Sequence, residues 1–159
     1  MSILKIKNKT VIITGASDGI GKGLAIHFAK LGFSLGLIAR RTELLLKVAD
    51  ECKKNGAIKV EIESVDVTNS TLFRAALDNL EKKLGATDIF ISNAGIAGVS
   101  KYKKDNHENA IHVLNVNLIA SIVGIEWMKE RMVQRGSGTI VGVSSVAAAR
   151  GIPTAGTYS

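Results

Sequence analysis

The sequence has few of the residues on which several classes of protein depend. It contains one cysteine, one proline and only 4% aromatic residues. A single thiol, Cys52, excludes an internal disulfide and a cysteine-built metal cluster, and its amphipathic surroundings predict an inert side chain. Few aromatic rings are present on which the bases of a nucleic acid could stack. The net charge of +7 is therefore interpreted as scattered, solvated lysine and arginine.

Long apolar segments and clustered metal ligands are also lacking. The first nine residues, MSILKIKNK, have no apolar stretch typical of a signal peptide, and no run of 18 apolar residues predicts a membrane span. The three histidines, His27, His107 and His112, do not form a set that predicts a metal site. These absences predict a cytoplasmic protein that binds neither a metal nor a nucleic acid.

Glycine, by contrast, is abundant, with 16 residues placed where the apolar pattern changes period. Apolar or alternating runs predict strands at 9–15, 33–40, 59–67, 88–95 and 138–145. Helical spacing is found at 19–32, at 42–56, at 69–85 and in a long segment that ends near 135 and is broken near 115–117. Strand and helix thus alternate along a single domain, 1–159. That alternation predicts an α/β fold with a doubly wound parallel sheet and helices on both faces.

The expected helices carry their own end signals. Leu24, Phe28 and Leu31 share one face of the first helix. Thr42 is expected to cap the second helix, and Asn69 or Ser70 the third.

The stretch TGASDGIG, residues 14–21, follows the first strand and opens the first helix, which is the context of a dinucleotide-binding turn. Its glycines would allow a sharp turn, a close approach of the backbone to a pyrophosphate, and close packing of the helix on the sheet. Free N–H groups and the helix dipole favour an anion there. A glycine-rich turn that binds nothing remains the alternative. The candidate cofactor residues of this turn are Thr14, Gly15, Ser17, Asp18, Gly19, Ile20 and Gly21.

The end of the second strand indicates which dinucleotide is preferred. An acidic residue there would bind an adenosine ribose, whereas an arginine accommodates a 2′-phosphate. The sequence reads IARR, so Arg40 and Arg41 occupy this place. A guanidinium matches a phosphate in a bidentate way. NADP(H) is therefore favoured and NAD(H) stays open. Two solvated arginines before a helix are the simpler alternative.

Four further stretches lie at expected strand ends or in the long helix: DVT at 66–68, NAG at 93–95, NVNL at 115–118 and VSSVAA at 143–148. Ligands of open parallel sheets bind outside the carboxyl ends of the strands. Together with TGASDGIG and the terminal TYS, this ordered set resembles the short-chain dehydrogenase/reductase family from residue 9 to the end. The resemblance implies a Rossmann-like fold and an NADP(H)-dependent oxidoreductase that interconverts a carbonyl and an alcohol. It also implies a small or lipid-like substrate and a homodimer or homotetramer.

The same resemblance implies further cofactor residues. Asp66 and Val67 would contact the adenine ring, although Asp66 could instead cap the helix that follows. Asn93, Ala94 and Gly95 would line the path of the cofactor, although they could also form a simple turn after a strand.

Three residues match the catalytic positions of the family. Asn117, rather than Asn115, precedes the leucine of the family's V-N-L pattern and would hold a water in a proton relay. Ser145, rather than Ser144, lies thirteen residues before Tyr158 and would orient the substrate carbonyl. Tyr158 would donate the proton, or accept it in the reverse direction. A polar helix cap and a loop hydroxyl are the alternatives for Asn117 and Ser145.

The family pattern also has a lysine four residues after its tyrosine, which makes the tyrosine usable as an acid or base near neutral pH. The sequence ends at Ser159, before that position and before the later strands of the family. The chain is therefore interpreted as the N-terminal part of a longer single-domain enzyme, inactive by itself and lacking the C-terminal strands. The alternative is a truncated or non-catalytic NADP-binding module of the same fold.

Overall fold

A parallel sheet of five strands forms the centre of the structure, a computed structural model that describes residues 8–97, 107–151 and 157–158. Its spatial order is β3-β2-β1-β4-β5, and every neighbouring pair is parallel. The order reverses between β1 and β4, where a doubly wound sheet leaves a crevice at its carboxyl end. The α/β architecture expected from the sequence is confirmed. The strands are β1 (Thr10–Thr14), β2 (Ser34–Ala39), β3 (Val60–Ser64), β4 (Ile89–Ser92) and β5 (Thr139–Gly142).

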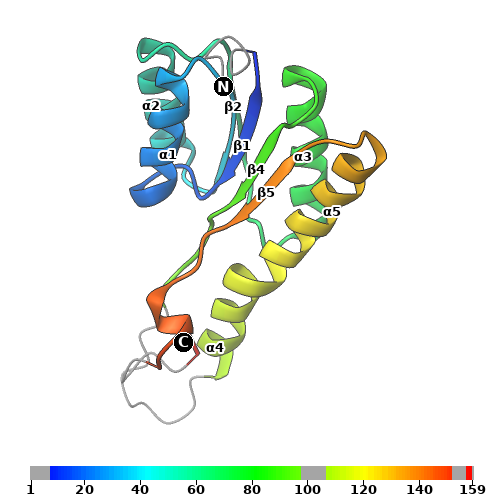
Figure 1. Cartoon of the computed structure of the whole chain (residues 1–159). Helices are drawn as coiled ribbons and strands as arrows, with labels where there is room; N and C mark the ends of the chain where they lie inside the picture. The colour runs from blue at the N-terminus through cyan, green and yellow to red at the C-terminus, as the bar shows by residue number, and fades with distance from the viewer. Residues whose placement is uncertain (1–7, 98–106, 152–156, 159) are drawn as a thin grey trace.

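Helices cover both faces of the sheet (Figure 1). The helices α1 (Gly19–Lys30) and α2 (Thr42–Lys54) lie on one face, and α3 (Ser70–Leu84) and α5 (Ala120–Gln134) lie on the other. Each layer has its own apolar core, so the central strands β1 and β2 are buried along their whole length. The edge strand β5 is mostly exposed. The site-bearing ends of β1 and β2 are therefore the most firmly packed part of the sheet.

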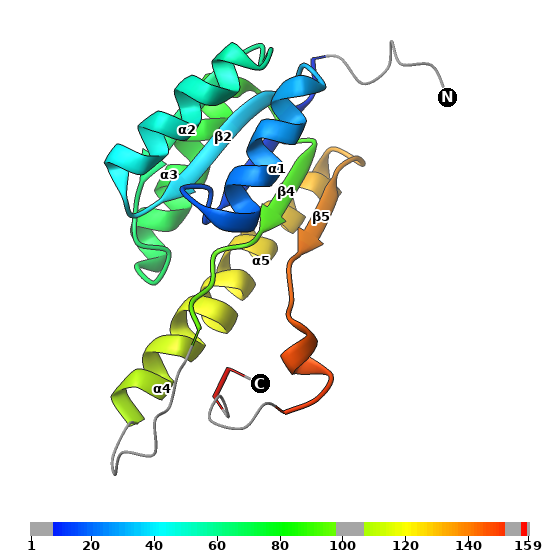
Figure 2. The same cartoon turned by 90° about the vertical axis from the view of Figure 1, so that its left-hand side faces the viewer.

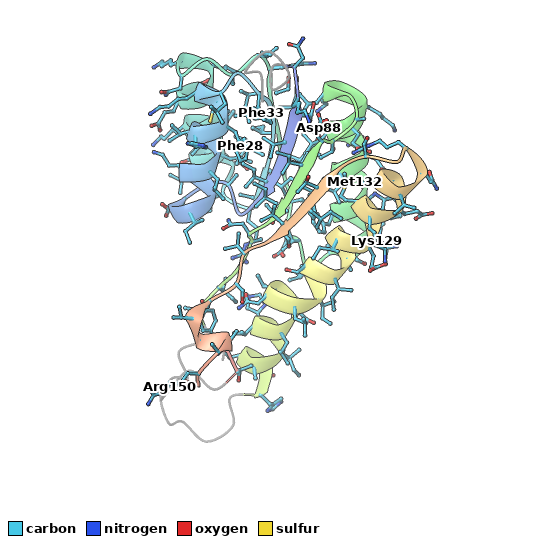
Figure 3. The ribbon with its side chains drawn as sticks, viewed as in Figure 1. Phe28, Phe33, Asp88, Lys129, Met132 and Arg150 are labelled. Carbon is cyan, nitrogen blue, oxygen red and sulfur yellow. The ribbon has the colours of Figure 1, made fainter. Side chains whose placement is uncertain are left out.

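The face of α1 that meets the sheet is made of small residues. Its buried residues are Gly21, Ala25 and Ala29, while Leu31 keeps 43% of its surface exposed. Small residues bring the helix axis close to the sheet, and the larger Leu24 and Phe28 pack at its sides. The ring of Phe28 meets that of Phe33 edge to face, with 5.0 Å between centroids (Figure 3). Leu24 and Phe28 thus lie on either side of a contact between α1 and the sheet that is made by small residues.

The cap expected from the sequence is present at α3 but not at α2. Asn69 caps α3 by accepting a hydrogen bond from the Leu72 amide at 3.1 Å, as one of the two expected choices. The expectation for Thr42 was wrong. Arg41 occupies the cap position of α2 without a side-chain bond, and the Thr42 hydroxyl instead meets that of Ser64 at 2.6 Å. The Thr42 hydroxyl therefore joins the start of α2 to the end of β3.

The long helix is interrupted where the sequence predicts a break. A short helix, α4 (His107–Leu114), continues through one wide turn, η2 (Asn115–Ile119), into α5. Such π-type turns insert an extra residue and are frequent at functional sites. Figure 2 shows α4 running past the carboxyl end of the sheet. The wide turn therefore lies where the helix passes the strand ends.

The run of 28 helical residues from His107 to Gln134 is long and apolar enough to cross a membrane by length and composition alone. A core helix of a soluble protein passes the same test. Val116, Ala120, Met128 and Met132 of this run are buried in the core between the sheet and α3. Only 28% of the most apolar window of this run is buried inside the structure.

The two ends of the sheet have different characters. At the amino end, the Asp88 carboxylate accepts a 2.8 Å hydrogen bond from the Thr10 amide and so ties β4 to β1. Figure 3 places Asp88 at this end and Arg150, beyond β5, at the other. The amino end is closed by such ties. The carboxyl end holds the residues that the sequence singles out.

Candidate active site

A cleft of about 570 Å³ opens at the carboxyl ends of the first four strands. It includes most of the residues predicted to bind the cofactor, together with Ala39, Val65, Ile96 and Val116, which the sequence did not single out. Apolar residues at such places have no distinguishing pattern in a sequence. We call it the carboxyl-end cleft. Its lining residues are Gly15, Ser17, Asp18, Gly19, Ile20, Ala39, Arg40, Arg41, Val65, Asp66, Val67, Asn93, Ala94, Gly95, Ile96 and Val116.

The three glycines of the first turn differ in their surroundings. Gly15 has a φ of +68°, and a Cβ atom there would come within 2.8 Å of the Ala94 Cα. A Cβ atom at Gly21 would overlap the carbonyl oxygen of Gly15, so the helix packs directly on the turn. Gly19 has a φ of +53° and open space around its Cα. The turn is therefore closed toward the sheet and open toward the cleft.

The start of α1 offers backbone donors to the cleft. Asp18 caps the helix, with its Oδ1 atom accepting a 2.8 Å bond from the Gly19 amide. The amides of Ile20 and Gly21 have no acceptor within the described part of the chain. Free amides and the helix dipole suit an anionic group. The hydrogen bond from Gly19, followed by that from Arg41, lowers the pKa of Asp18 below its usual value.

Thr14 holds the cleft together from behind. Its hydroxyl accepts bonds from the amides of Asn93 at 2.9 Å and Ala94 at 3.0 Å, and it is itself buried. The Asn93 side chain returns a 2.9 Å bond to the Thr14 carbonyl. Thr14 and Gly21 are thus absent from the lining of the carboxyl-end cleft. Thr14 stabilises the walls of the cleft by hydrogen bonds, and Gly21 allows α1 to pack closely on the turn.

The two arginines at the end of β2 are each paired with a different aspartate. Arg40 lies 3.5 Å from Asp66, across the ends of β2 and β3. Arg41 lies 3.4 Å from Asp18 and donates a 3.3 Å bond to the Ser17 hydroxyl. The pairs therefore connect the β2 end to both neighbouring loops.

The protonation of Asp66 depends on competing effects. Burial would raise the pKa of Asp66, but hydrogen bonds from the Thr68 amide and hydroxyl, with the charge of Arg40, hold it below its usual value. The bonds from Thr68, at 3.0 and 2.8 Å, form a local turn before α3, whereas the capping alternative considered for Asp66 is wrong, because Asn69 caps α3. The carboxylate therefore both closes this turn and lines the cleft.

Asn117 lies in the wide turn of the long helix and fastens the loop after β4. Its Oδ1 accepts a 2.8 Å bond from the Ile96 amide, and its Nδ2 donates a 2.9 Å bond to the Ile96 carbonyl. Its own carbonyl accepts a bond from the Ser121 hydroxyl at 2.9 Å. The side chain thus positions the loop that carries Gly95. Asn115 is exposed on the same turn.

Ser145 and Tyr158 lie at the same end of the sheet as the cleft. Ser145 follows β5 and caps the short helix η3 (Val146–Ala148) by accepting a 3.1 Å bond from the Ala147 amide. The segment 157–158 lies near η3 in both views (Figures 1 and 2), and Tyr158 is half-buried. Across the ranges that the structure covers, no hydrogen bond joins Asn117, Ser145 and Tyr158. Asn117, Ser145 and Tyr158 therefore lie at the same end of the fold but in separate segments.

Two expectations about reactive groups can be compared with the structure. Among residues 8–97, 107–151 and 157–158, no group of three histidine, cysteine or acidic side chains could hold a metal ion. Cys52 is buried, and burial, assisted by Glu51, raises the pKa of its thiol to about 11. A thiol that stays protonated near neutral pH is a poor nucleophile, in agreement with its predicted inertness.

A second open cleft, of about 670 Å³, lies between the outer surfaces of α3 and α5. We call it the α3–α5 cleft. The Trp127 indole forms part of its wall, with the guanidinium of Arg74 5.3 Å from the ring centroid. The indole N–H donates a 3.0 Å bond to Asp78. Helical side chains, rather than backbone, line this cleft. Its lining residues are Arg74, Ile122, Val123, Glu126, Trp127, Lys129, Glu130, Val133 and Gln134.

Several solved dehydrogenases and reductases have folds similar to that of this chain. Among solved structures, a short-chain type dehydrogenase/reductase from Mycobacterium marinum superposes with a TM-score of 0.90 at 32% identity, covering 99% of this chain and 66% of that one. NAD⁺-bound xylitol dehydrogenase superposes with a TM-score of 0.89 at 25% identity, covering 97% and 59%. An actinorhodin polyketide ketoreductase with NADPH gives 0.89 at 25% identity, covering 94% and 58%.

Sequence comparison leads to the same group. An uncharacterized oxidoreductase of Myxococcus xanthus is 31% identical over 151 residues, which are 95% of this chain and 59% of that protein. The chain therefore spans about three-fifths of the length of this relative. The model of the short chain dehydrogenase family matches residues 9–159. The chain belongs to the short-chain dehydrogenase family.

Proposed function

We propose that the protein containing this chain is an NADP(H)-dependent oxidoreductase that interconverts a carbonyl and an alcohol. The observation that carries the cofactor preference is the pair of guanidinium groups at the end of β2, Arg40 and Arg41, both on the lining of the carboxyl-end cleft. No carboxylate occupies the end of β2 where NAD-binding folds place one on the ribose. Solved relatives carry NAD⁺ in one case and NADPH in another, so a nicotinamide cofactor suits the family in either form.

The residues of the cleft fit such a cofactor. Gly19 leaves open space for the close approach of a pyrophosphate, and the free amides of Ile20 and Gly21 would hold its oxygens. Arg40 and Asp66 stand where the adenosine end would lie, and Asn93 to Gly95 line the way toward η2. The negative charge of a 2′-phosphate would be balanced by the arginines.

The catalytic proposal rests on three side chains of this chain. A bound nicotinamide supplies or accepts the hydride. Ser145 would donate a hydrogen bond to the substrate oxygen and orient the carbonyl, because its own oxygen already accepts from the Ala147 amide and its O–H group is left to turn outward. Tyr158 would transfer the proton. The side chain of Asn117 is hydrogen-bonded to Ile96 and would hold the loop after β4. The backbone carbonyl of Asn117 would accept a hydrogen bond from the water of the proton relay.

Substrate, assembly and location are proposed more coarsely. The substrate is a small or lipid-like carbonyl or alcohol, since a steroid dehydrogenase is named among relatives at 32% identity. A homodimer or homotetramer is supported by the exposed apolar side chains of the long helix, among them Leu118 and Ile122. We place the protein in the cytoplasm.

Titration of the purified protein with NADPH and NADH tests the proposal. NADPH is expected to bind at least tenfold more tightly than NADH, and Arg40→Asp should remove most of that difference, because it puts a carboxylate beside the 2′-phosphate. Arg74→Asp, the same charge change at the α3–α5 cleft, is the matched control and should leave both affinities unchanged. Equal affinities for NADPH and NADH in the unmodified protein would refute the NADP preference. Tight NADPH binding without turnover of carbonyl substrates by the full-length protein would favour the non-catalytic module.

A further inference from the structure

The two arginines of the carboxyl-end cleft are held in different ways. Arg40 faces Asp66, whose other carboxylate oxygen is fixed by two hydrogen bonds from Thr68. Arg41 faces Asp18, whose other oxygen caps α1 through the Gly19 amide. Asp18 therefore joins the phosphate-binding turn directly to the arginine at the end of β2.

The Asp18–Arg41 pair stands in the path of a 2′-phosphate. The Asp18 side chain is 71% exposed and the Arg41 side chain 57%, so the pair is open to solvent and weak. An exposed ion pair can be displaced by a ligand that carries nearly two negative charges. A 2′-phosphate that approaches Arg41 must either displace the carboxylate or bind beside it as a like charge. Both alternatives weaken the binding of the phosphate.

Resting on the proposed function, we infer that Asp18 is a specificity-determining residue that limits the preference for NADPH. Its carboxylate competes with the 2′-phosphate for the Arg41 guanidinium. Asp18 acts through Arg41 and is a positioning residue in this sense. NADH lacks the 2′-phosphate and places no charge beside Arg41, so its affinity does not depend on the Asp18 carboxylate. The protein therefore discriminates between NADPH and NADH less strongly than two unpaired arginines would allow.

The capping role of Asp18 does not need its charge. Asparagine and serine cap helices about as well as aspartate, through the same kind of side-chain acceptor. Asp18→Asn thus removes the negative charge while keeping an acceptor for the Gly19 amide. This makes the electrostatic role separable from the structural one.

A double-mutant cycle measures the competition, with NADPH and NADH as the probes. Asp18→Asn is expected to tighten NADPH binding about threefold to fivefold, the range that loss of one exposed ion pair permits, with NADH affinity unchanged within twofold. In an Arg41→Gln background the same change should gain less than twofold. The gain should also shrink as salt is raised, because the charges are exposed. Asp18→Ser repeats the test with a second capping residue if Asp18→Asn folds poorly.

Two results would overturn the inference. One is an unchanged ratio of NADPH to NADH affinity in both Asp18 variants, which includes equal gains for both cofactors. The other is a full gain for NADPH that persists without Arg41. Equal affinities for the two cofactors in the unmodified protein would refute the proposed NADP preference alone. A selective gain for NADPH in Asp18→Asn would then still support the role of Asp18. The two failures are therefore distinguishable.

Discussion

The carboxyl-end cleft and the α3–α5 cleft are similar in size, at about 570 and 670 Å³, but they are built differently. The first has a backbone wall with glycine at Gly15 and Gly19, free amides and two arginines. The second is lined by long helical side chains around Trp127, which is already bonded to Asp78. Volume alone would favour the second. Backbone donors beside a topological switch point favour the first as the ligand site.

The largest effect is expected where the carboxyl-end cleft depends on backbone contact. Gly21→Val should destabilise the protein by about 3 kcal/mol or more and abolish NADPH binding, because its side chain would overlap the Gly15 carbonyl. Gly23→Ala, on the same helix with open space around it, is the control and should be neutral or stabilising by up to about 1 kcal/mol. Chemical denaturation and NADPH titration measure both. Equal stability of the two variants would contradict the close packing of α1.

The next effect concerns chemistry rather than binding. Tyr158→Phe in the full-length protein should lower the turnover rate by about 10²- to 10⁴-fold, because the proton donor is lost. NADPH affinity should stay within twofold, since the ring is kept. Ser144→Ala is the control and should retain activity. A Tyr158→Phe variant with full turnover would remove Tyr158 from the mechanism.

A smaller effect is expected at the wide turn of the long helix. Asn117→Ala leaves the amide and carbonyl of Ile96 without their partners, at a cost of about 1–3 kcal/mol, and should weaken NADPH binding through the loop after β4. Asn115→Ala changes an exposed residue of the same turn and should have little effect on either property. Thermal unfolding and titration test the pair. Similar losses of stability and NADPH affinity in both variants would attribute the effect to the turn as a whole and not to the contact between Asn117 and Ile96.

The smallest functional effect should come from the α3–α5 cleft. Trp127→Phe removes the hydrogen bond to Asp78 and weakens the stacking of Arg131, whose guanidinium lies 4.1 Å from the ring centroid. Stability should fall by about 1–2 kcal/mol, while NADPH affinity should not change. Ile122→Ala, at the exposed rim of the same cleft, should change neither by much. A weakened NADPH affinity in Trp127→Phe would place the cofactor near the wrong cleft.

The sequence predicts those features of the fold that follow from local pattern. The strand at β1, the turn at Gly15 and the break near Asn117 are all local, and each is present in the structure. Strand order, and with it the meeting of Arg40 and Asp66, is visible only in the assembled sheet.

The remaining features depend on tertiary contacts that no local pattern specifies. The sheet-facing side of α1 is made of Gly21, Ala25 and Ala29, because a close contact needs small residues rather than the most apolar ones. The Thr42 hydroxyl binds across to Ser64 instead of capping its own helix. The α3–α5 cleft arises only when two distant helices meet. Such pairings depend on the assembled fold, which single-sequence periodicity does not describe.

For the site residues too, some roles follow from residue type and position, and others only from tertiary contacts. Residue types at strand ends identify the candidates Arg41, Asp66 and Asn93, which line the carboxyl-end cleft. The pairing of Arg41 with Asp18, and the engagement of both ends of the Asn117 amide, are visible only from geometry.

The central claim is that NADPH lies in the carboxyl-end cleft with its phosphates at the start of α1. NMR titration of isotope-labelled protein with NADPH tests it at individual atoms. We predict that the amide resonances of Ile20, Gly21 and Ala94 shift on binding while the Trp127 indole N–H resonance stays in place. Shifts confined to Trp127 and its neighbours in the α3–α5 cleft would contradict the account.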